Sequence, residues 1–349
     1  MFTCFRRSLY ELACLYPRLA PAQKSGSLYI SSVSRANTFL PSFFILLCTY
    51  SSWRLQFCCS VVQLLSATMY SLSIVAALAT LFSSTLAISA PQMPGFNPTW
   101  VEDFSGTSIN TANWQHWTPA PTNGEQEIYT ADIDNCNVTA SNTLQILPQN
   151  SGGQWTSCRI ETLGVWSANA TNPKMLVQAS IKVGVPGVTA SQLMGIWPAF
   201  WSLGVGVRNG VPWPACGEID TFENVRGVPT GYGTLHCGNA CHDNQGNVGI
   251  SNSTSFTYGT FHTWAHEVDL TSADWTAQAI TFFVDGTQYQ QIRGSDVRDL
   301  TAWTTLTGDM MLTLNVAVGG DWGGAAGAST ATGITAGMEV EYVAVYHSN

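Results

Sequence analysis

The stretch Gly217-Glu218-Ile219-Asp220-Thr221-Phe222-Glu223 brings three carboxylates close together in the chain and alternates them with apolar side chains. In a regular strand, residues two apart share a face, so Glu218 and Asp220 point the same way. Glu223 lies five positions after Glu218, an odd spacing, and would point to the opposite face. A β-bulge between Asp220 and Glu223 adds one residue and turns Glu223 back. The stretch therefore predicts a bulged strand with all three acids on one surface.

Three carboxylates on one face repel one another, and a purely structural strand would avoid that cost. A retaining glycosidase needs such a grouping, because a carboxylate nucleophile and a carboxylic acid must flank the scissile bond about 5–5.5 Å apart. We assign Glu218 as the nucleophile, Glu223 as the acid/base, and Asp220 as the residue that orients Glu218 and tunes its protonation. The alternative is a solvated row of idle acids on an edge strand. The apolar Ile219 and Phe222 between the acids argue against that alternative.

The surrounding chain is rich in Gly, Thr, Ser, Asn and Trp, which disfavours helices and suits strands joined by turns. Asp285-Gly286 predicts a tight hairpin. No run of a dozen residues has clear helical spacing, and no repeat or linker follows Pro91. Residues 91–349 thus predict one all-β domain, a sandwich of two sheets. Alternating runs that predict strands occupy 144–147, 175–183, 263–270, 280–284, 311–318 and 338–346.

Charge is divided unevenly along the chain. Residues 1–68 hold six of the thirteen Lys and Arg and one acid, Glu11, so residues 69–349 hold seven bases and twenty-one acids, a net charge of −14. Such an acidic body disfavours nucleic acid and anionic membranes, and it fits a neutral polysaccharide partner. Residues 1–68 show neither helical nor strand periodicity, and we interpret them as a disordered or spurious N-terminal extension.

Residues 69–90 have the features of a secretion signal, with an apolar core followed by small residues. Cleavage is expected after Ala87 or Ala90, which predicts export to the extracellular space or cell wall. No Lys or Arg separates Met69 from the apolar core, however. An uncleaved signal-anchor over residues 61–90 is therefore the alternative, because this uncharged run is long enough to span a bilayer and the upstream bases would face the cytoplasm.

Five cysteines lie in the body of the chain: Cys136, Cys158, Cys216, Cys237 and Cys241. Export permits disulfides, but an odd number leaves one thiol over and the sequence alone does not dictate the pairing. We expect Cys136–Cys158 and Cys237–Cys241, with Cys216 free and buried beside the acid-bearing strand. Three N-glycosylation sequons agree with export and predict surface loops; they begin at Asn137, Asn169 and Asn252.

Seven segments in the same order resemble glycoside hydrolase family 16. The acid motif has the bulged ExDxxE form of laminarinases and endo-1,3(4)-β-glucanases, fungal ones especially, whereas lichenases of that family carry an unbulged ExDxE. The resemblance covers nearly all of residues 96–346. Besides the acid motif it rests on residues 101–104, 123–130 (similar to the family's N-x-x-Q-x-Y-T segment), 195–201, 233–236, 314–322 and 340–346.

This resemblance implies a concanavalin-like β-jelly roll of two antiparallel sheets, with the three acids on the concave face of an open cleft. It also implies retention of configuration through a covalent glycosyl-enzyme. Many members of the family hold a structural Ca²⁺ on the convex side, for which Glu341 is the candidate ligand here. We see no structural-zinc cysteine pattern, phosphate loop or catalytic triad motif, so no cofactor is expected to be required.

Aromatic side chains are candidates for sugar binding, because flat rings stack on the C–H faces of sugars. Twelve of the thirteen tryptophans follow the first 68 residues. Trp197, Trp201 and Trp213 precede the acids, and a hairpin would bring their rings to the same cleft. Trp322 follows two glycines and is a candidate platform on a loop at the rim. Each of the four has a simpler alternative as an ordinary core residue.

Four polar residues are further candidates for substrate binding. His236 follows the acid-bearing strand after a turn, so an antiparallel return would set it near the acids, where it could hydrogen-bond a carboxylate or a sugar hydroxyl. The segment that resembles the family's N-x-x-Q-x-Y-T motif supplies Asn123, Glu125 and Gln126 as hydrogen-bonding partners of the sugar.

The sequence therefore predicts a secreted, monomeric, endo-acting hydrolase that cleaves β-1,3 and mixed β-1,3/1,4 glucans with retention. One alternative is a cell-wall glucan transglycosylase, which uses the same acids and passes the glycosyl group to a sugar. The other is a non-catalytic glucan-binding lectin, which is disfavoured because lectin-like members of the family typically lose the acids. The acid motif does not decide the preferred linkage, because loops do.

Overall fold

The computed structural model describes residues 29–30, 45–46, 89–120, 122–246 and 248–349. The chain divides into two units, 1–84 and 85–349. In the first, β1 (Tyr29–Ile30) pairs with β2 (Ile45–Leu46). The predicted signal at 69–90 and the alternative anchor at 61–90 lie outside the described residues, save for their last two positions. No helix in the described ranges is long and apolar enough to cross a membrane.

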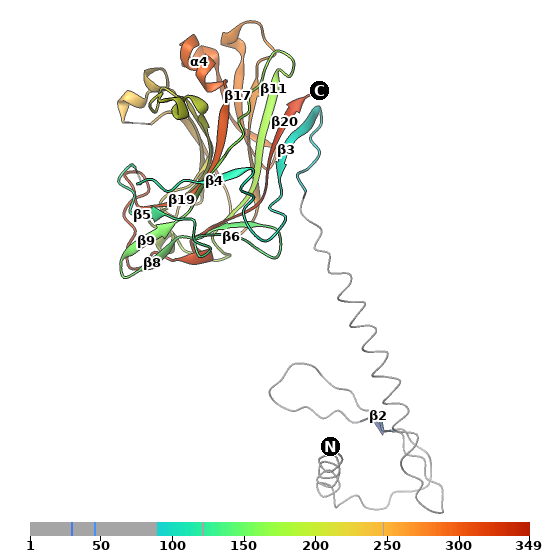
Figure 1. The fold of residues 1–349 in the computed structure, drawn as a ribbon, viewed down its shortest axis with the longest axis vertical. Coiled ribbons are helices and arrows are strands. Elements are labelled where there is room, and N and C mark those ends of the chain that lie inside the picture. Colours follow the sequence, from blue (N-terminus) through green and yellow to red (C-terminus); the bar gives the residue numbers. More distant parts are fainter. Residues whose placement is uncertain (1–28, 31–44, 47–88, 121, 247) are drawn as a thin grey trace, which may run out of the picture. The chain divides into compact units, whose positions relative to one another are not determined.

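The second unit is a sandwich of two large antiparallel sheets (Figure 1), as predicted. The first sheet runs in the order β15 (Ile250–Ser255), β14 (Thr230–His236), β13 (Glu218–Glu223), β12 (Ile196–Gly204), β19 (Met310–Val318), β10 (Arg159–Thr162) and β4 (Trp114–His116). The second runs in the order β18 (Thr287–Arg293), β17 (Ala279–Val284), β16 (His262–Asp269), β11 (Lys174–Val183), β20 (Met338–Ser348), β7 (Leu144–Ile146) and β6 (Cys136–Val138), while β3 (Phe96–Glu102) also pairs with β20.

A third, small sheet was not predicted. It joins β5 (Glu127–Tyr129), β9 (Gln154–Ser157) and β8 (Gln149–Ser151), and β5 runs parallel to β9. It lies at the end of the sandwich opposite to α4 (Leu300–Leu306), as Figure 1 shows. The other helical segments of the unit are single turns: η1 (Ala190–Gln192), η2 (Val205–Asn209), η3 (Gly238–Cys241), η4 (Asp243–Gln245), η5 (Trp275–Ala277), α3 (Gly294–Val297) and η6 (Gly333–Thr335).

The alternating patterns in the sequence explain the two layers. On β11, Met175 and Val177 point into the core between the sheets, while Leu176 lies in a separate cluster on the outer face. Burying each such side chain contributes about 1.5–3 kcal/mol. All six runs that were expected to be strands are strands. The predicted hairpin is also present, because Val284 pairs with Thr287 across Asp285 and Gly286, both of which have positive φ.

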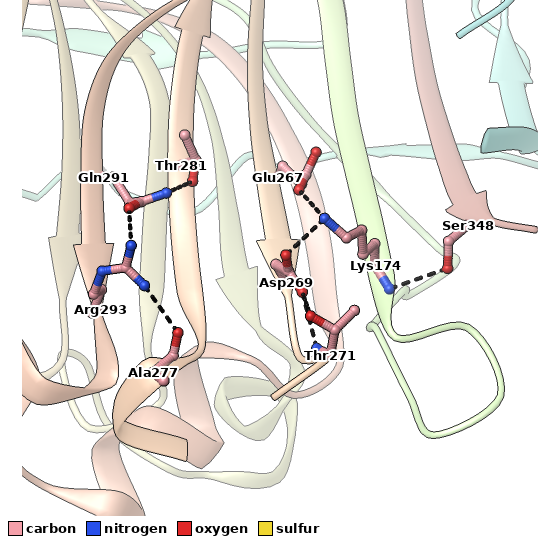
Figure 2. A network of polar contacts seen from close by, with 9 residues as sticks. All are labelled: Lys174, Glu267, Asp269, Thr271, Ala277, Thr281, Gln291, Arg293 and Ser348. Atoms are coloured by element: carbon pink, nitrogen blue, oxygen red, sulfur yellow. Dashed lines mark hydrogen bonds and ion pairs between the residues drawn. The ribbon is translucent and has the colours of Figure 1, made fainter. Parts of the chain in front are cut away.

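The outer face of the second sheet carries cross-strand polar contacts (Figure 2). Lys174 Nζ lies 2.7 Å from Asp269 and 3.2 Å from Glu267 on the neighbouring strand. On β17 and β18, the Gln291 amide donates to the Thr281 hydroxyl at 3.1 Å. The Lys174 side chain is 35% exposed, so these ion pairs add little stability. They satisfy the polar groups of the outer face and do not contribute to the opposite sheet, where the acids lie.

Both predicted disulfides, Cys136–Cys158 and Cys237–Cys241, are present, and Cys216 is free and buried. The prediction that the sequons lie in surface loops is correct for Asn169, which is exposed in a turn. It is wrong for the other two, since Asn137 lies in β6 and Asn252 in β15. Both are edge strands, which alternate between buried and accessible positions, and Asn252 is exposed while Asn137 is half-buried.

Candidate active site

The bulge in β13 is present where the sequence predicts it. On one side Phe200 pairs with Phe222 and Trp201 pairs with Asp220, so Thr221 is the extra residue. On the other side, the pairing with β14 shifts between Asp220 and Glu223.

The bulge brings the three acids to one face of the sheet. Glu218, Asp220 and Glu223 line a single cavity, while Ile219 and Phe222 are buried in the core between the sheets.

The extra residue of the bulge, Thr221, is hydrogen-bonded to the opposite sheet. Thr221 and His266 are both fully buried, and the Thr221 hydroxyl lies 2.8 Å from His266 Nδ1 on β16 of the opposite sheet. Burial lowers the pKa of His266 to about 3. The ring is therefore neutral, and its Nδ1 can accept a hydrogen bond from the Thr221 hydroxyl. The hydrogen bond ties the bulge to the second sheet.

The acids lie in a cleft made of two adjoining cavities of about 400 and 340 Å³. The two cavities share Asn123, Trp197, Trp213, Glu218 and Glu223 as walls. The larger continues along Tyr232, His236 and Trp322, and the smaller continues along Trp117, Arg159, Trp201 and Asn315. The cleft therefore offers space on both sides of the acids, which suits a chain-like ligand lying across them.

Burial raises the pKa of Glu223 to about 7, although the indole Nε1 of Trp197 donates to its carboxylate at 2.9 Å and opposes that rise. A carboxyl with such a pKa keeps its proton at weakly acidic pH, as a general acid requires. Burial also raises the pKa of Glu218, but the positive charge of His236 and a hydrogen bond from Trp213 favour its ionised form. The two carboxyls thus have different partners that suit different roles.

Asp220 lies between these two acids. Burial, followed by the charges of Glu218 and Glu223, raises the pKa of Asp220 well above its usual range. Its Oδ2 lies 3.4 Å from His236 Nε2 and has no hydrogen-bond partner among the described residues. A protonated Asp220 can donate to its neighbours. The tuning role of Asp220 stays a prediction, and this arrangement supplies the charged neighbours that such a role needs.

All four predicted tryptophans line the cleft. Trp322 is edge-on to Trp197, with ring centroids 5.5 Å apart, and Arg226 Nε donates to its carbonyl at 2.8 Å, which holds the loop. Trp213 is 39% exposed and so presents a free face. Trp201 is less accessible, and its indole donates to Asn315 Oδ1 at 2.7 Å.

The predicted polar residues divide into two groups. His236 lies directly opposite Glu218 on β14, and Asn123 and Glu125 also line the cleft. Gln126 is not among the lining residues: its side-chain oxygen accepts from the Ala326 amide at 2.9 Å. Outside the cleft, Glu341 accepts from the Ser180 hydroxyl, and no cluster of three acidic, His or Cys ligands includes it within the described ranges.

The residues missed at the sequence level include two charged ones in or beside the cleft. Arg159 lies between the rings of Trp117 and Trp201, 4.7 and 4.6 Å from their centroids, and it pairs with Glu161 at 2.5 Å. In the sequence, the only feature that points to Arg159 is that it is a single basic residue in a short strand.

The other is Glu127, which is buried beside Glu125. Burial, and then the charge of Glu127, raises the pKa of Glu125 to about 8.

Two groups of side chains in the described ranges are close enough to hold a metal ion. One combines His116 with Cys136 and Cys158, whose sulfurs are joined in a disulfide and cannot ligate. The other consists of residues of the acid cluster itself. Carboxyl and imidazole chemistry on shared protons accounts for that cluster, and we assign no metal to it.

A jelly roll with a bulged row of acids across an open cleft defines a glycoside hydrolase. The chain belongs to glycoside hydrolase family 16, as its motifs predicted. Residues 185–282 match the family described as "XgeA-like, catalytic GH16 domain".

One similar solved structure is the endo-1,3-β-glucanase of Streptomyces sioyaensis. It is 35% identical with a TM-score of 0.68, and the match covers 75% of this chain and all of that one.

Two curated relatives are similar over most of this chain. Glucan endo-1,3-β-glucosidase A1 of Niallia circulans is 28% identical over 283 residues, which are 73% of this chain and 38% of the relative. The β-glucanase of Rhodothermus marinus is 29% identical over 265 residues, 72% of this chain and 86% of the relative. The chain thus spans well under half the length of the Niallia protein.

Proposed function

We propose that this chain is an endo-acting β-glucanase that hydrolyses β-1,3 and mixed β-1,3/1,4 glucans with retention of configuration. The observation that carries the proposal is the bulge in β13, which sets Glu218 and Glu223 on one face of the cleft. The relatives named above are glucanases, which supports a glucan as the substrate. The acidic body of the chain agrees with a neutral polymer.

In this mechanism Glu218 attacks the anomeric carbon while Glu223 gives its proton to the departing glycosidic oxygen. A covalent glycosyl-enzyme and a shortened glucan result. Glu223, now ionised, takes a proton from water as that water attacks the anomeric carbon and releases Glu218. Asp220 holds Glu218 in position and shares the charge that moves among the acids.

Binding is proposed to rest on aromatic rings and a few polar groups. Trp197 and Trp213 lie next to both acids, and Trp322 and Trp201 extend the platform in the two directions of the cleft. Rings stack on sugar faces without fixing the position of a chain end, and the cleft continues on both sides of the acids. Both features favour attack on internal bonds.

A glucan transglycosylase remains the rival proposal, because it needs the same acids and a sugar in place of water. A lectin is less favoured, since all three acids are retained in a cleft that raises the pKa of Glu223 to about 7. Sizing products in the presence of an acceptor oligosaccharide separates the two enzymatic proposals: longer products indicate transfer, and shorter products alone indicate hydrolysis.

We also propose that the protein is exported through residues 69–90, reaches the extracellular space or cell wall, and acts as a monomer without a required cofactor. The two disulfides are compatible with export. Exposure of Asn169 and Asn252 supports glycan attachment at these sequons, and Asn137 is a third candidate. A structural Ca²⁺ at Glu341 would be tested by chelation followed by thermal unfolding.

The deciding experiment assays the protein on laminarin, lichenan, cellulose, agarose and xyloglucan and sizes the products. We expect mixed oligosaccharides from laminarin and lichenan at early times. Glu218→Gln should abolish cleavage, whereas Asp132→Asn, an exposed acid outside the cleft, should not. Persistent hydrolysis by Glu218→Gln would contradict the assigned nucleophile, and cleavage of agarose or xyloglucan alone would contradict the substrate class.

A further inference from the structure

Asp243 is a buried acid that the mechanism above does not use. It is 4% exposed and begins η4, in the segment that follows β14. Its Oδ1 lies 2.5 Å from Nδ1 of His236. The other nitrogen of that ring, Nε2, lies 3.4 Å from Asp220 in the acid cluster. Asp243 is therefore one imidazole ring away from the catalytic acids.

The loop around Asp243 is built to hold its carboxylate in one orientation. Oδ2 accepts from the backbone amides of Cys237 and Gly238, at 2.9 and 2.7 Å. The Cys237–Cys241 disulfide closes the turn between β14 and Asp243. With both amides directed at Oδ2, Oδ1 is left for His236. A carboxylate with three such contacts is strongly fixed.

This contact determines how His236 presents itself to the cleft. Because a carboxylate can only accept, Nδ1 of His236 must carry the proton. Nε2 then faces Asp220, and the Trp213 ring packs against the imidazole with centroids 5.5 Å apart. Without Asp243, the ring could take the other tautomer or rotate.

We propose that Asp243 is a positioning residue that acts through His236 to keep Glu218 ionised. The kinetic part of this inference rests on the proposed glucanase function, whereas the state of the His236 ring does not. A carboxylate behind an imidazole that faces reacting acids is a general way to fix a tautomer and stabilise an imidazolium.

The charges around His236 support this role. The ionisable groups that face it are Asp243 behind the ring and Glu218, Asp220 and Glu223 on β13. The neighbouring β15 contributes only uncharged residues, and the uncharged Trp213 ring packs against the imidazole.

Burial alone would lower the pKa of His236, but the surrounding carboxylates, Asp243 first, outweigh it and raise that pKa. The resulting imidazolium opposes the rise in the pKa of Glu218 that burial causes, and its effect is larger than that of the Asp243 charge, which adds to the rise.

The simpler alternative is that Asp243 only ties down its own loop through the two backbone amides. Asn at this position would keep an oxygen for those amides and present an NH₂ group to Nδ1. His236 would then be forced into the opposite, neutral tautomer. Asp243→Asn is thus nearly isosteric for the loop and disruptive only for the ring, which separates the two explanations.

The test begins with the wild-type protein, in which the His236 nitrogens are followed by NMR through a pH titration. We expect a pKa above the ordinary value of about 6.5, with the proton on Nδ1. Asp243→Asn should lower this pKa by at least one unit, while the control Asp132→Asn should leave it unchanged. A wild-type pKa at or below the ordinary value would overturn the inference even if the variant did not fold.

The kinetic arm follows kcat/KM on laminarin against pH. Asp243→Asn should move the acid limb upward by about one pH unit, a roughly tenfold loss below the limb, with the alkaline limb in place. In a His236→Gln background the same substitution should cause no further shift. A loss that is equal at every pH, or that persists without His236, would show a merely structural role. If the wild-type protein cleaved no glucan, the proposed function would fail while the NMR result still judged Asp243.

Discussion

Replacing Trp197 with Phe should shift the alkaline limb of the pH–activity profile to higher pH. The indole Nε1 of Trp197 donates to the Glu223 carboxylate at 2.9 Å. That hydrogen bond stabilises the ionised form of Glu223 and opposes the rise in pKa that burial causes. Phe retains an aromatic ring in the cleft but has no donor. The ionised form therefore loses stabilisation, and the pKa of Glu223 rises.

The size of the shift follows from the strength of the lost contact. A hydrogen bond to a charged group contributes about 1.5–3 kcal/mol, and one pKa unit corresponds to about 1.36 kcal/mol. The full loss would therefore be about one to two units. Water can enter the open cleft and replace part of the contact, so we expect about one unit, from about 7 to roughly 8.

The assay measures kcat/KM on a soluble laminarin oligosaccharide across the pH range, because this parameter reports ionisations of the free enzyme. Trp201→Phe is the matched control: its indole lines the same cleft but donates to Asn315 and not to an acid. It should alter KM and leave the alkaline limb in place. An unchanged or lowered alkaline limb in Trp197→Phe would refute the assignment of Glu223 as the proton donor.

Three further predictions concern stability. Thr221→Val should lower the free energy of unfolding by about 1–3 kcal/mol, because the buried His266 Nδ1 loses its hydrogen-bond partner. In urea titrations, the double variant with His266→Leu should recover most of that loss. An additive loss would contradict the pairing. Glu223→Gln should stabilise the protein by on the order of 2–3 kcal/mol at about pH 8 and by little at about pH 4, as thermal unfolding would measure. The sign follows from a folded pKa of about 7 against an ordinary value of 4.5. The folded state binds more protons between these values, so wild-type stability falls as the pH rises through this window. An equal effect at both pH values would contradict the cause. Lys174→Met should change stability by less than about 1 kcal/mol in urea, because its ion pairs are partly exposed, and a larger loss would show that the outer-face network is cooperative.

The sandwich and its bulged strand could be predicted because both depend on local periodicity. An alternating pattern identifies a strand wherever one face is buried. The odd spacing between Glu218 and Glu223 lets both side chains lie on the same face only if the strand contains one extra, bulged residue. The small sheet of β5, β9 and β8 could not be predicted in this way. Its strands have three or four residues each, and β8 (Gln149–Ser151) buries none of them, so no period is visible.

The site was predictable where its residues are neighbours in the chain. Gln126 was expected in the cleft, but it directly precedes β5, in which side chains alternate between buried and exposed positions. This alternation buries Glu127, and Gln126 instead contacts a different loop. A shift of one residue exchanges the two faces of a strand, and a motif match does not determine the phase. Arg159 and Asp243 come from other segments of the chain. Only the assembled sheet brings Arg159 between two indole rings and Asp243 behind His236.

The central claim is that Glu218 forms a covalent bond to the sugar. In the most direct measurement, the protein is incubated with an activated 2-deoxy-2-fluoro laminari-oligosaccharide, because the fluorine slows hydrolysis of the glycosyl-enzyme. The adduct is then mapped by mass spectrometry. We predict one added 2-deoxy-2-fluoro-oligosaccharyl group on the peptide that contains Glu218, and none in Glu218→Gln. An active protein that forms no adduct, or one whose adduct lies on a residue other than Glu218, would contradict the mechanism.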